Sequence, residues 1–178
     1  MYTAEVYLFV LFIFEKSEGR YNIMKYKNTL LAVKDMKRSI AFYKEVLGLH
    51  VIMDFGANVT LTGGLCLQTL DSWSKFINTS EIFFGGRECE VYFEEDDFDK
   101  FVEKIDKVKD LKYVHRVIEH RWGQRAVRFY DPDMHIIEVG ENMKSVCRRF
   151  IDSGLTAEET AKRMDVPIKY VNSALRGK

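Results

Sequence analysis

The distribution of apolar residues predicts a strand, a helix and three further strands in the first part of the chain. Residues 28–33 (NTLLAV) form a short apolar run, after which apolar residues recur at helical spacing from Met36 to Leu47. Asp35 is placed to cap that helix, and Gly48 is placed to end it. Turns that contain glycine then separate three predicted strands, at residues 49–54, 57–62 and 65–69.

The same order of elements returns further along the chain. Residues 89–94 (CEVYFE) predict a strand, and Asp97 caps a helix that carries apolar residues on one side up to Val108. Three more strands follow, at residues 113–119, 125–130 and 135–140. Asp35 and Asp97 match at an offset of 62 residues, and the closing strands GGLCLQ and DMHIIE match at an offset of 70. This internal repeat predicts an α+β fold in which two βαβββ modules form a curved mixed sheet around a pocket.

The remaining segments lie outside the repeat. Residues 71–86 form a connection, with room for one helical turn around Trp73 and Phe76. Three helical patterns follow the second module, at about residues 142–152, 157–164 and 168–175. The chain therefore divides into an N-terminal extension (1–23), the repeated body (24–140) and a small C-terminal helical tail (141–178).

The N-terminal extension contains one strongly apolar run, from Val6 to Phe14. This run is too short to span a bilayer, and Glu5 stands where a signal peptide would carry positive charge. We interpret the segment as an extra strand or a poorly anchored extension. Met24 is a candidate functional start, because the regular pattern begins there.

Charge and cysteine content limit the classes of function. The chain holds 27 basic and 27 acidic residues, so no overall field attracts nucleic acid or an anionic membrane. Cys66, Cys89 and Cys147 are scattered and show no CxxC spacing. That pattern argues against a disulfide framework and a thiolate zinc site, and it favours a reducing compartment. We therefore expect a cytoplasmic protein without membrane association.

Two segments resemble a known family. Residues 28–49 (NTLLAVKDMKRSIAFYKEVLGL) resemble the opening of vicinal-oxygen-chelate domains, the glyoxalase/bleomycin-resistance/dioxygenase superfamily. Residues 122–139 (WGQRAVRFYDPDMHIIEV) resemble the closing hairpin of these domains. The resemblance covers about residues 24–140, and it implies a small-molecule pocket and a homodimer. It does not specify a reaction, because the superfamily includes lyases, dioxygenases, epimerases, fosfomycin-modifying enzymes and metal-free drug-sequestering proteins.

The resemblance also implies positions for a divalent metal ion. In metal-dependent members, the ligands lie at the start of the first strand and the end of the fourth strand of each module. Carried onto this chain, the four positions are Asn28, Gln68, Glu90 and Glu138. Relatives commonly have histidine at the first-strand positions, whereas none of the four histidines of this chain falls on a ligand position. An oxygen-only set suits a hard cation such as magnesium, manganese or calcium, although neutral amides are weak ligands.

Glu90 and Glu138 are also the candidate catalytic residues. If both carboxylates line one dry cleft without a metal, repulsion and burial would raise the pKa of one of them. The two would then form an acid/base pair. The alternative is that each glutamate faces solvent or pairs with an arginine.

Further candidates for substrate binding lie on two strands and one loop. Strand alternation places Cys66 and Tyr92 on the same face as the metal positions. His120, Trp122 and Arg125 precede or begin the penultimate strand, where they could hold a planar or anionic ligand. The alternative is a loop whose tryptophan covers the edge of the core.

The helical tail resembles a helix-turn-helix. Thr156 and Glu159 have capping-box spacing, and a turn at residues 165–167 separates two helical patterns. Residues 143–178 contain eight basic and four acidic residues, and the second helix offers few polar side chains at its start. We therefore expect a tail that packs on its own or a partner domain and does not bind nucleic acid.

Three functions remain open from the sequence. The first is a glyoxalase-type lyase or isomerase that acts on a small oxygenated molecule, with Glu138 moving a proton. The second is a metal-free binding protein similar to the bleomycin-resistance members. The third is a ligand-responsive regulator that acts through the helical tail. The missing histidines count against lactoylglutathione lyase activity itself, and metal dependence would separate the first function from the second.

Overall fold

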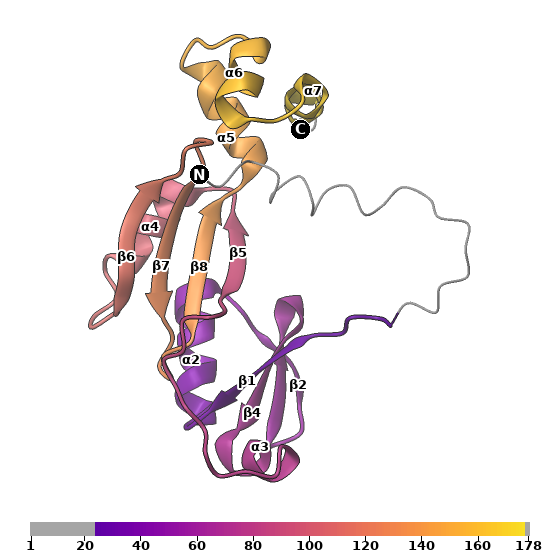
Figure 1. Ribbon diagram of the computed structural model, residues 1–178. Coiled ribbons are helices and arrows are strands. Elements are labelled where there is room, and N and C mark those ends of the chain that lie inside the picture. The colour runs from indigo at the N-terminus through magenta and orange to yellow at the C-terminus, as the bar shows by residue number, and fades with distance from the viewer. Residues whose placement is uncertain (1–23, 177–178) are drawn as a thin grey trace.

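The computed structural model describes residues 24–176, which form two four-stranded sheets and a terminal group of helices (Figure 1). The extra strand expected near Val6–Phe14 lies outside the described residues. Within the described part of the chain, no helix is long and apolar enough to cross a membrane.

The first module has the predicted order of elements. It consists of β1 (Thr29–Val33), α2 (Met36–Leu47), β2 (Val51–Asp54), β3 (Asn58–Leu61) and β4 (Leu65–Thr69), followed by the short helix α3 (Leu70–Phe76). Asp35 caps α2 by accepting a hydrogen bond from the Arg38 backbone N–H, and Gly48 ends the helix at a φ of 70°. The strand order is β1-β4-β3-β2, with β1 parallel to β4.

The second module repeats this architecture. It consists of β5 (Val91–Glu95), α4 (Phe98–Ile105), β6 (Tyr113–Glu119), β7 (Arg125–Tyr130) and β8 (Ile136–Glu141), in the strand order β5-β8-β7-β6. Asp97 caps α4 as predicted, but the helix ends at Ile105 and does not reach Val108. The α+β class and the two βαβββ modules are therefore confirmed, and hydrogen bonding divides the strands into two sheets.

The strand register corrects one feature of the predicted repeat. Thr29 pairs with Leu65 in the first sheet, and Val91 pairs with Ile137 in the second. The first strands thus keep the offset of 62, whereas the fourth strands differ by 72 and not by 70. The residue of the first sheet that corresponds to Glu138 is consequently Cys66 rather than Gln68.

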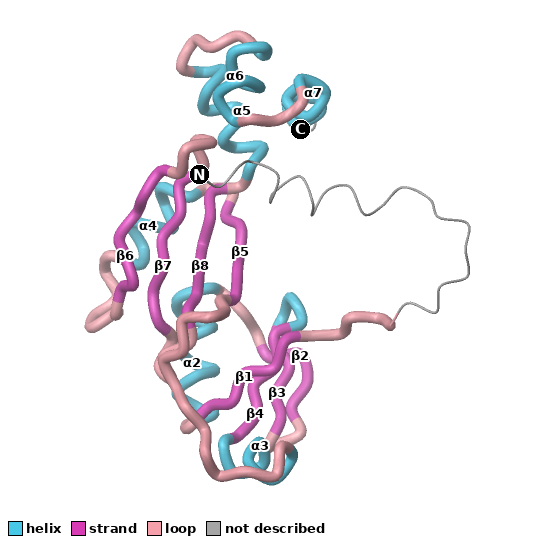
Figure 2. Tube along the Cα trace, viewed as in Figure 1, coloured by secondary structure: helices cyan, strands magenta, loops and turns pink. Residues whose placement is uncertain are grey.

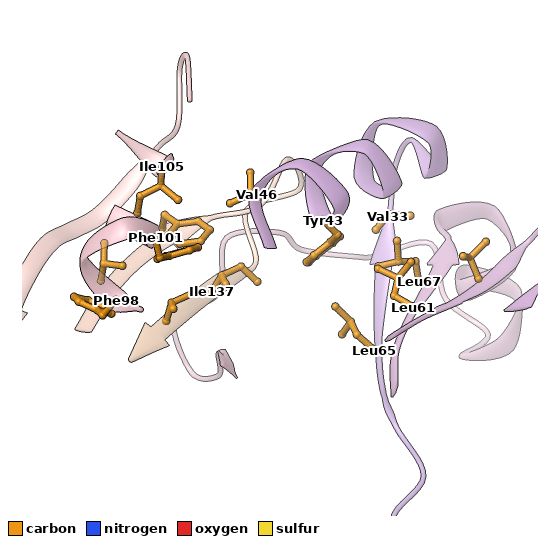
Figure 3. Close-up of a cluster of buried hydrophobic side chains, with 14 residues drawn as sticks. Val33, Tyr43, Val46, Leu61, Leu65, Leu67, Phe98, Phe101, Ile105 and Ile137 are labelled. Carbon is orange, nitrogen blue, oxygen red and sulfur yellow. The ribbon is translucent and has the colours of Figure 1, made fainter. Parts of the chain in front are cut away.

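Helix α2 lies between the two modules and joins them into one core. Figure 3 shows Tyr43 and Val46 of α2 between Leu67 of the first module and Ile137 of the second. These side chains belong to one buried cluster, which continues through β7, β8 and α4. Neither sheet could bury its apolar face as completely without the other module.

A buried turn between β7 and β8 fastens α2 to the second module. Asp131 accepts a hydrogen bond from the Tyr43 hydroxyl at 2.9 Å, and Asp133 accepts one from Nη2 of Arg38 at 3.0 Å. The two aspartates are only 4% and 1% exposed, and these donors add to the hydrogen bonds that they accept from Ser39 and from the backbone. Burial and the neighbouring carboxylates raise the pKa of Tyr43 well above its ordinary value, and its hydroxyl therefore remains a donor.

The C-terminal helices form a second, smaller core. Helices α5 (Met143–Asp152), α6 (Ala157–Met164) and α7 (Ile168–Arg176) pack around a separate cluster that includes Val146, Phe150, Met164 and Val171. Figure 2 shows these helices beyond one end of the second sheet. The predicted capping box of Thr156 and Glu159 is present at the start of α6.

The contact between α2 and the buried turn gives a stability prediction. We expect Tyr43→Phe to lower the free energy of unfolding by about 1–3 kcal/mol, because the buried Asp131 carboxylate would lose a donor. Urea denaturation measures this change. Tyr26→Phe is the control, since the Tyr26 hydroxyl bonds Thr29 on the exposed surface, and we expect a change below about 0.5 kcal/mol. Equal losses in the two variants would contradict a special role for the buried bond.

Candidate functional site

Four polar side chains form a row across the second sheet. The register pairs Tyr92 of β5 with Glu138 of β8, Glu138 with Arg128 of β7, and Arg128 with His115 of β6. Paired residues of neighbouring strands project from the same face, so the four side chains follow one line. Figure 1 shows α4 behind this sheet, where the alternate residues join the apolar core. The row therefore lies on the face that α4 does not cover.

A buried carboxylate occupies the centre of the row. Glu138 is 1% exposed, and Nη2 of Arg128 lies in ion-pair contact with its Oε2, which receives no further hydrogen bond among the described residues. Nε of the same guanidinium donates to Oε2 of Glu90 at 2.7 Å. One arginine thus holds both candidate catalytic glutamates, which is the second alternative that the sequence left open. The positive charge between the carboxylates offsets the mutual repulsion on which the acid/base expectation depends.

His115 completes the surroundings of the guanidinium. Its Nε2 lies 3.1 Å from Nη1 of Arg128, and its Nδ1 lies 2.8 Å from the Arg116 carbonyl oxygen. Because a guanidinium only donates and a carbonyl only accepts, the imidazole carries its hydrogen on Nδ1 and accepts through Nε2. The sequence predicts no role for His115, because it does not lie at a ligand position of the family.

Tyr92 closes the other end of the row and anchors a hydrogen-bond network. Its hydroxyl donates to Oε1 of Glu94 at 3.1 Å and accepts from Nε2 of Gln124 at 3.0 Å. The Gln124 side chain, which is 1% exposed, also donates to the Glu141 carbonyl oxygen. The ring packs over Gly140, where an added Cβ would lie 3.1 Å from it. Tyr92 is nevertheless 42% exposed, so a fixed aromatic surface is available beside Glu138.

His120 and Trp122 form an aromatic pair in the loop between β6 and β7. Their rings stack with centroids 4.5 Å apart and an interplanar angle of 8°, and Nε1 of Trp122 donates to Oε1 of Gln124. Burial lowers the pKa of His120, and the charge of Arg128 lowers it further. The effect of Arg128 shows that His120 lies within electrostatic reach of the row.

The remaining candidate on β7, Arg125, projects from the opposite face of the sheet. Its Nε and Nη2 donate to Glu141 at 3.0 and 3.1 Å, and its Nη1 donates to Asp99 of α4 at 2.7 Å. The odd spacing between Arg125 and Arg128 causes this separation, because strand residues alternate between faces. The structure therefore brings Arg128 to the row and leaves Arg125 away from it.

The candidates of the first module lie in the other sheet. Asn28 is exposed just before β1. Gln68 is buried, accepts a hydrogen bond from Nδ2 of Asn58 at 2.7 Å, and donates to the Ser72 hydroxyl. Cys66 is also buried, with its sulfur 3.4 Å from the Thr60 hydroxyl. These contacts are all local to the first module, and the structure does not join these residues to Glu90 and Glu138.

The arrangement does not fit the metal site that the resemblance implies. Across residues 24–176, no group of three or more His, Cys, Asp or Glu side chains is placed to hold a metal ion. The four oxygen-bearing positions are divided between two sheets, and the guanidinium of Arg128 already binds the two carboxylates of the second sheet. A divalent ion at these carboxylates would have to displace the arginine.

Comparison with known proteins agrees with the fold. The model of the glyoxalase-like domain family matches residues 26–144. Metallothiol transferase FosB from Lysinibacillus sphaericus (strain C3-41) is 27% identical over 117 residues, which cover 65% of this chain and 81% of FosB.

Similar solved structures have the same fold. A protein of unknown function from Agrobacterium tumefaciens str. C58 is 34% identical, with a TM-score of 0.61 over 69% of this chain and 98% of its own. A lactoylglutathione lyase from Agrobacterium tumefaciens shares the fold at 23% identity, with a TM-score of 0.51 over 67% of this chain and 94% of its own. The chain therefore belongs to the glyoxalase-like domain family, within the glyoxalase/bleomycin-resistance/dioxygenase superfamily.

Proposed function

We propose that this chain binds a small oxygenated molecule on the face of the second sheet that carries Tyr92, Glu138 and Arg128. The observation that carries the proposal is the buried ion pair of Glu138 and Arg128 at the centre of that face. A buried ion pair is costly to desolvate, and apolar residues of similar size would often be at least as stable. Retaining the pair in an otherwise well-packed sheet supports a role in recognition.

The neighbouring side chains offer complementary contacts to such a ligand. The guanidinium of Arg128 supplies a positive charge that attracts ligand oxygens, while Tyr92 offers an exposed ring. The stacked pair of His120 and Trp122 supplies a second aromatic surface near the row. Binding without chemistry, as in the bleomycin-resistance type, is the mode that this geometry supports best, because it needs no metal.

A lyase or isomerase reaction of the glyoxalase type is the second candidate. The observation that favours it is that Glu138 holds the closing-strand position of the family and lies in the same row as the imidazole of His115, with Arg128 between them. In this reaction Glu138 would remove the proton from one substrate carbon and return it to the adjacent carbon, while the hydroxyl proton passes to the neighbouring carbonyl oxygen, so that the hydroxyl and carbonyl groups exchange positions. A divalent metal in this mode would have to displace Arg128. Turnover of a hemithioacetal of methylglyoxal, lost in Glu138→Gln, would favour this candidate over binding alone.

The binding proposal is tested by a thermal-shift screen followed by calorimetry. The probes are methylglyoxal hemithioacetals, fosfomycin, bleomycin and a panel of hydroxylated aromatic acids. For a probe that binds, we expect Tyr92→Ala and Arg128→Lys each to weaken affinity about tenfold or more, through loss of the ring and of the planar donor fork. Arg116→Ala is the matched control, since that side chain pairs with Asp106, and its affinity should stay near that of the wild type. Equal affinities in all variants would place the ligand elsewhere.

The lowered pKa of His120 gives a pH prediction. Because burial holds this pKa below the ordinary value of about 6.5, the unfolded chain binds more protons than the folded one in acid, and stability is lost as pH falls through this range. We expect His120→Gln to reduce the loss of unfolding free energy between pH 7 and pH 5. Urea denaturation at several pH values measures the slope, and NMR titration of the imidazole checks the pKa directly. A slope identical to that of the wild type would contradict the prediction.

We also propose that the chain forms a homodimer. β2 is an edge strand, and its Val51, Ile52 and Met53 side chains are 41%, 60% and 49% exposed. An apolar edge of this kind is typical of an interface. We expect sedimentation equilibrium to give a dimer and the double variant Ile52→Glu/Met53→Lys to shift it toward monomer. Lys144→Glu, at an exposed position of α5, is the control and should leave the dimer intact; a wild-type monomer would overturn the proposal.

A reducing, cytoplasmic location is the last part of the proposal. Cys66 and Cys147 are buried and Cys89 is exposed, and all three are free thiols. Burial raises the pKa of Cys147 and so keeps its thiol protonated and unreactive.

A further inference from the structure

We propose that Arg128 takes the place of a metal ion in this chain. His115, Glu90 and Glu138 converge on its guanidinium, and while the arginine is in place these three side chains are not positioned to hold a metal ion. Removing the guanidinium would leave them free to close around one. The inference rests on the proposed site, but it does not depend on which organic molecule binds there.

The geometry around the guanidinium is that of ligands around a cation. Nε of Arg128 lies 2.7 Å from Glu90, Nη1 lies 3.1 Å from Nε2 of His115, and Nη2 contacts Glu138. The three groups approach different nitrogen atoms and come from three different strands or strand ends. Two carboxylates and one imidazole are a ligand set that divalent zinc and manganese accept.

The orientation of His115 supports this reading independently of the carboxylates. Its Nδ1–H donates to the Arg116 carbonyl oxygen at 2.8 Å, which leaves the lone pair of Nε2 directed at Arg128. Histidines that bind metals almost always donate their other ring N–H to a carbonyl or carboxylate, because this bond fixes the tautomer. His115 thus already has the hydrogen-bond acceptor for Nδ1 that a metal-binding imidazole needs.

The positive charge of Arg128 keeps metal ions away from His115, Glu90 and Glu138. A guanidinium stays charged at every pH at which the protein is folded, so the buried Glu138 carboxylate always has a counter-charge. The arginine offsets one of the two carboxylate charges, and without it the two carboxylates face each other with no counter-charge. Because the contacts of 2.7 and 3.1 Å are made to different nitrogen atoms, the ligand atoms would have to move inward to lie about 2.0–2.2 Å from one metal ion. Glu90, which is only part-buried and directly precedes β5, is the ligand best able to move.

The proposal predicts a gain of metal binding when the arginine is removed. The experiment titrates the full chain with Mn²⁺ alone, followed by calorimetry and by electron paramagnetic resonance. We expect no saturable Mn²⁺ binding at Glu138 in the wild type. In Arg128→Ala we expect one equivalent at an affinity at least about tenfold higher, a change of about 1.4 kcal/mol.

Further variants identify the ligands. The double variants Arg128→Ala/His115→Ala and Arg128→Ala/Glu138→Gln should lose the gained affinity. Arg125→Ala is the matched control, because it removes an arginine from between Glu141 and Asp99, where the partners of the guanidinium are carboxylates alone. Arg128→Met keeps most of the side-chain volume and serves if the alanine variant unfolds; circular dichroism establishes folding before each titration. Arg128→Lys, which retains a cation, should gain little.

Two results would overturn the inference. One is Mn²⁺ binding by the wild type that Glu138→Gln removes, since the arginine would then not exclude the metal. The other is a folded Arg128→Met or Arg128→Ala variant that binds Mn²⁺ no tighter than Arg125→Ala. No organic ligand enters this titration, so a negative Mn²⁺ titration does not contradict the ligand-binding proposal. Likewise, a ligand screen without a hit does not contradict the metal-binding result.

Discussion

Two carboxylates in the turn at residues 131–133 constrain both the fold and the candidate site. They are buried, and the donors that reach Asp131 and Asp133 from outside the turn come from α2, from the backbone just before it and from His135. Because an unpaired buried carboxylate is strongly unfavourable, the turn and the helix must meet. The turn also connects β7 to β8 and so fixes the register that sets Arg128 opposite Glu138. The polar contact between this turn and α2 thus joins the two modules, and the turn itself sets the register at the centre of the row.

The sequence predicted the fold well, because each element has its own buried face and its own cap. Periodicity located the strands and helices to within a few residues, and Asp35, Asp97 and Thr156 all cap the helices expected of them. The exact correspondence between the modules was harder to predict. Matching the closing strands by residue type gave an offset of 70, whereas hydrogen bonding relates Glu138 to Cys66 at 72. Turn lengths between strands determine that offset, and residue types alone do not encode them reliably.

The candidate site was less predictable, since it depends on which strands pair and in what register. Arg125 and Arg128 are the same residue type on one strand, yet they project from opposite faces. Only the register places Arg128 between the two glutamates, and His115 reaches it across a pair of strands whose register shifts on both sides of that residue. The family positions singled out Glu90 and Glu138, and both side chains contact the guanidinium of Arg128. They could not show that the chain supplies this cation itself.

The helical tail, which the sequence pattern separates from the repeated body, helps to position the loop that carries His120 and Trp122 beside the row. Arg149 and Arg163 donate to the carbonyl oxygens of Gly123 and Arg121, on either side of Trp122. Gly123 has a φ of 89°, and an added Cβ there would lie 2.3 Å from the ring of Phe150, so the loop fits against α5 only with glycine. Although burial tends to raise the pKa of Glu141, Arg125 and Arg149 hold it below its ordinary value, which gives a stable charge at this junction. Two of the basic residues of the tail therefore serve its attachment to the sheet, and the stacked pair of His120 and Trp122 depends on that attachment for its position.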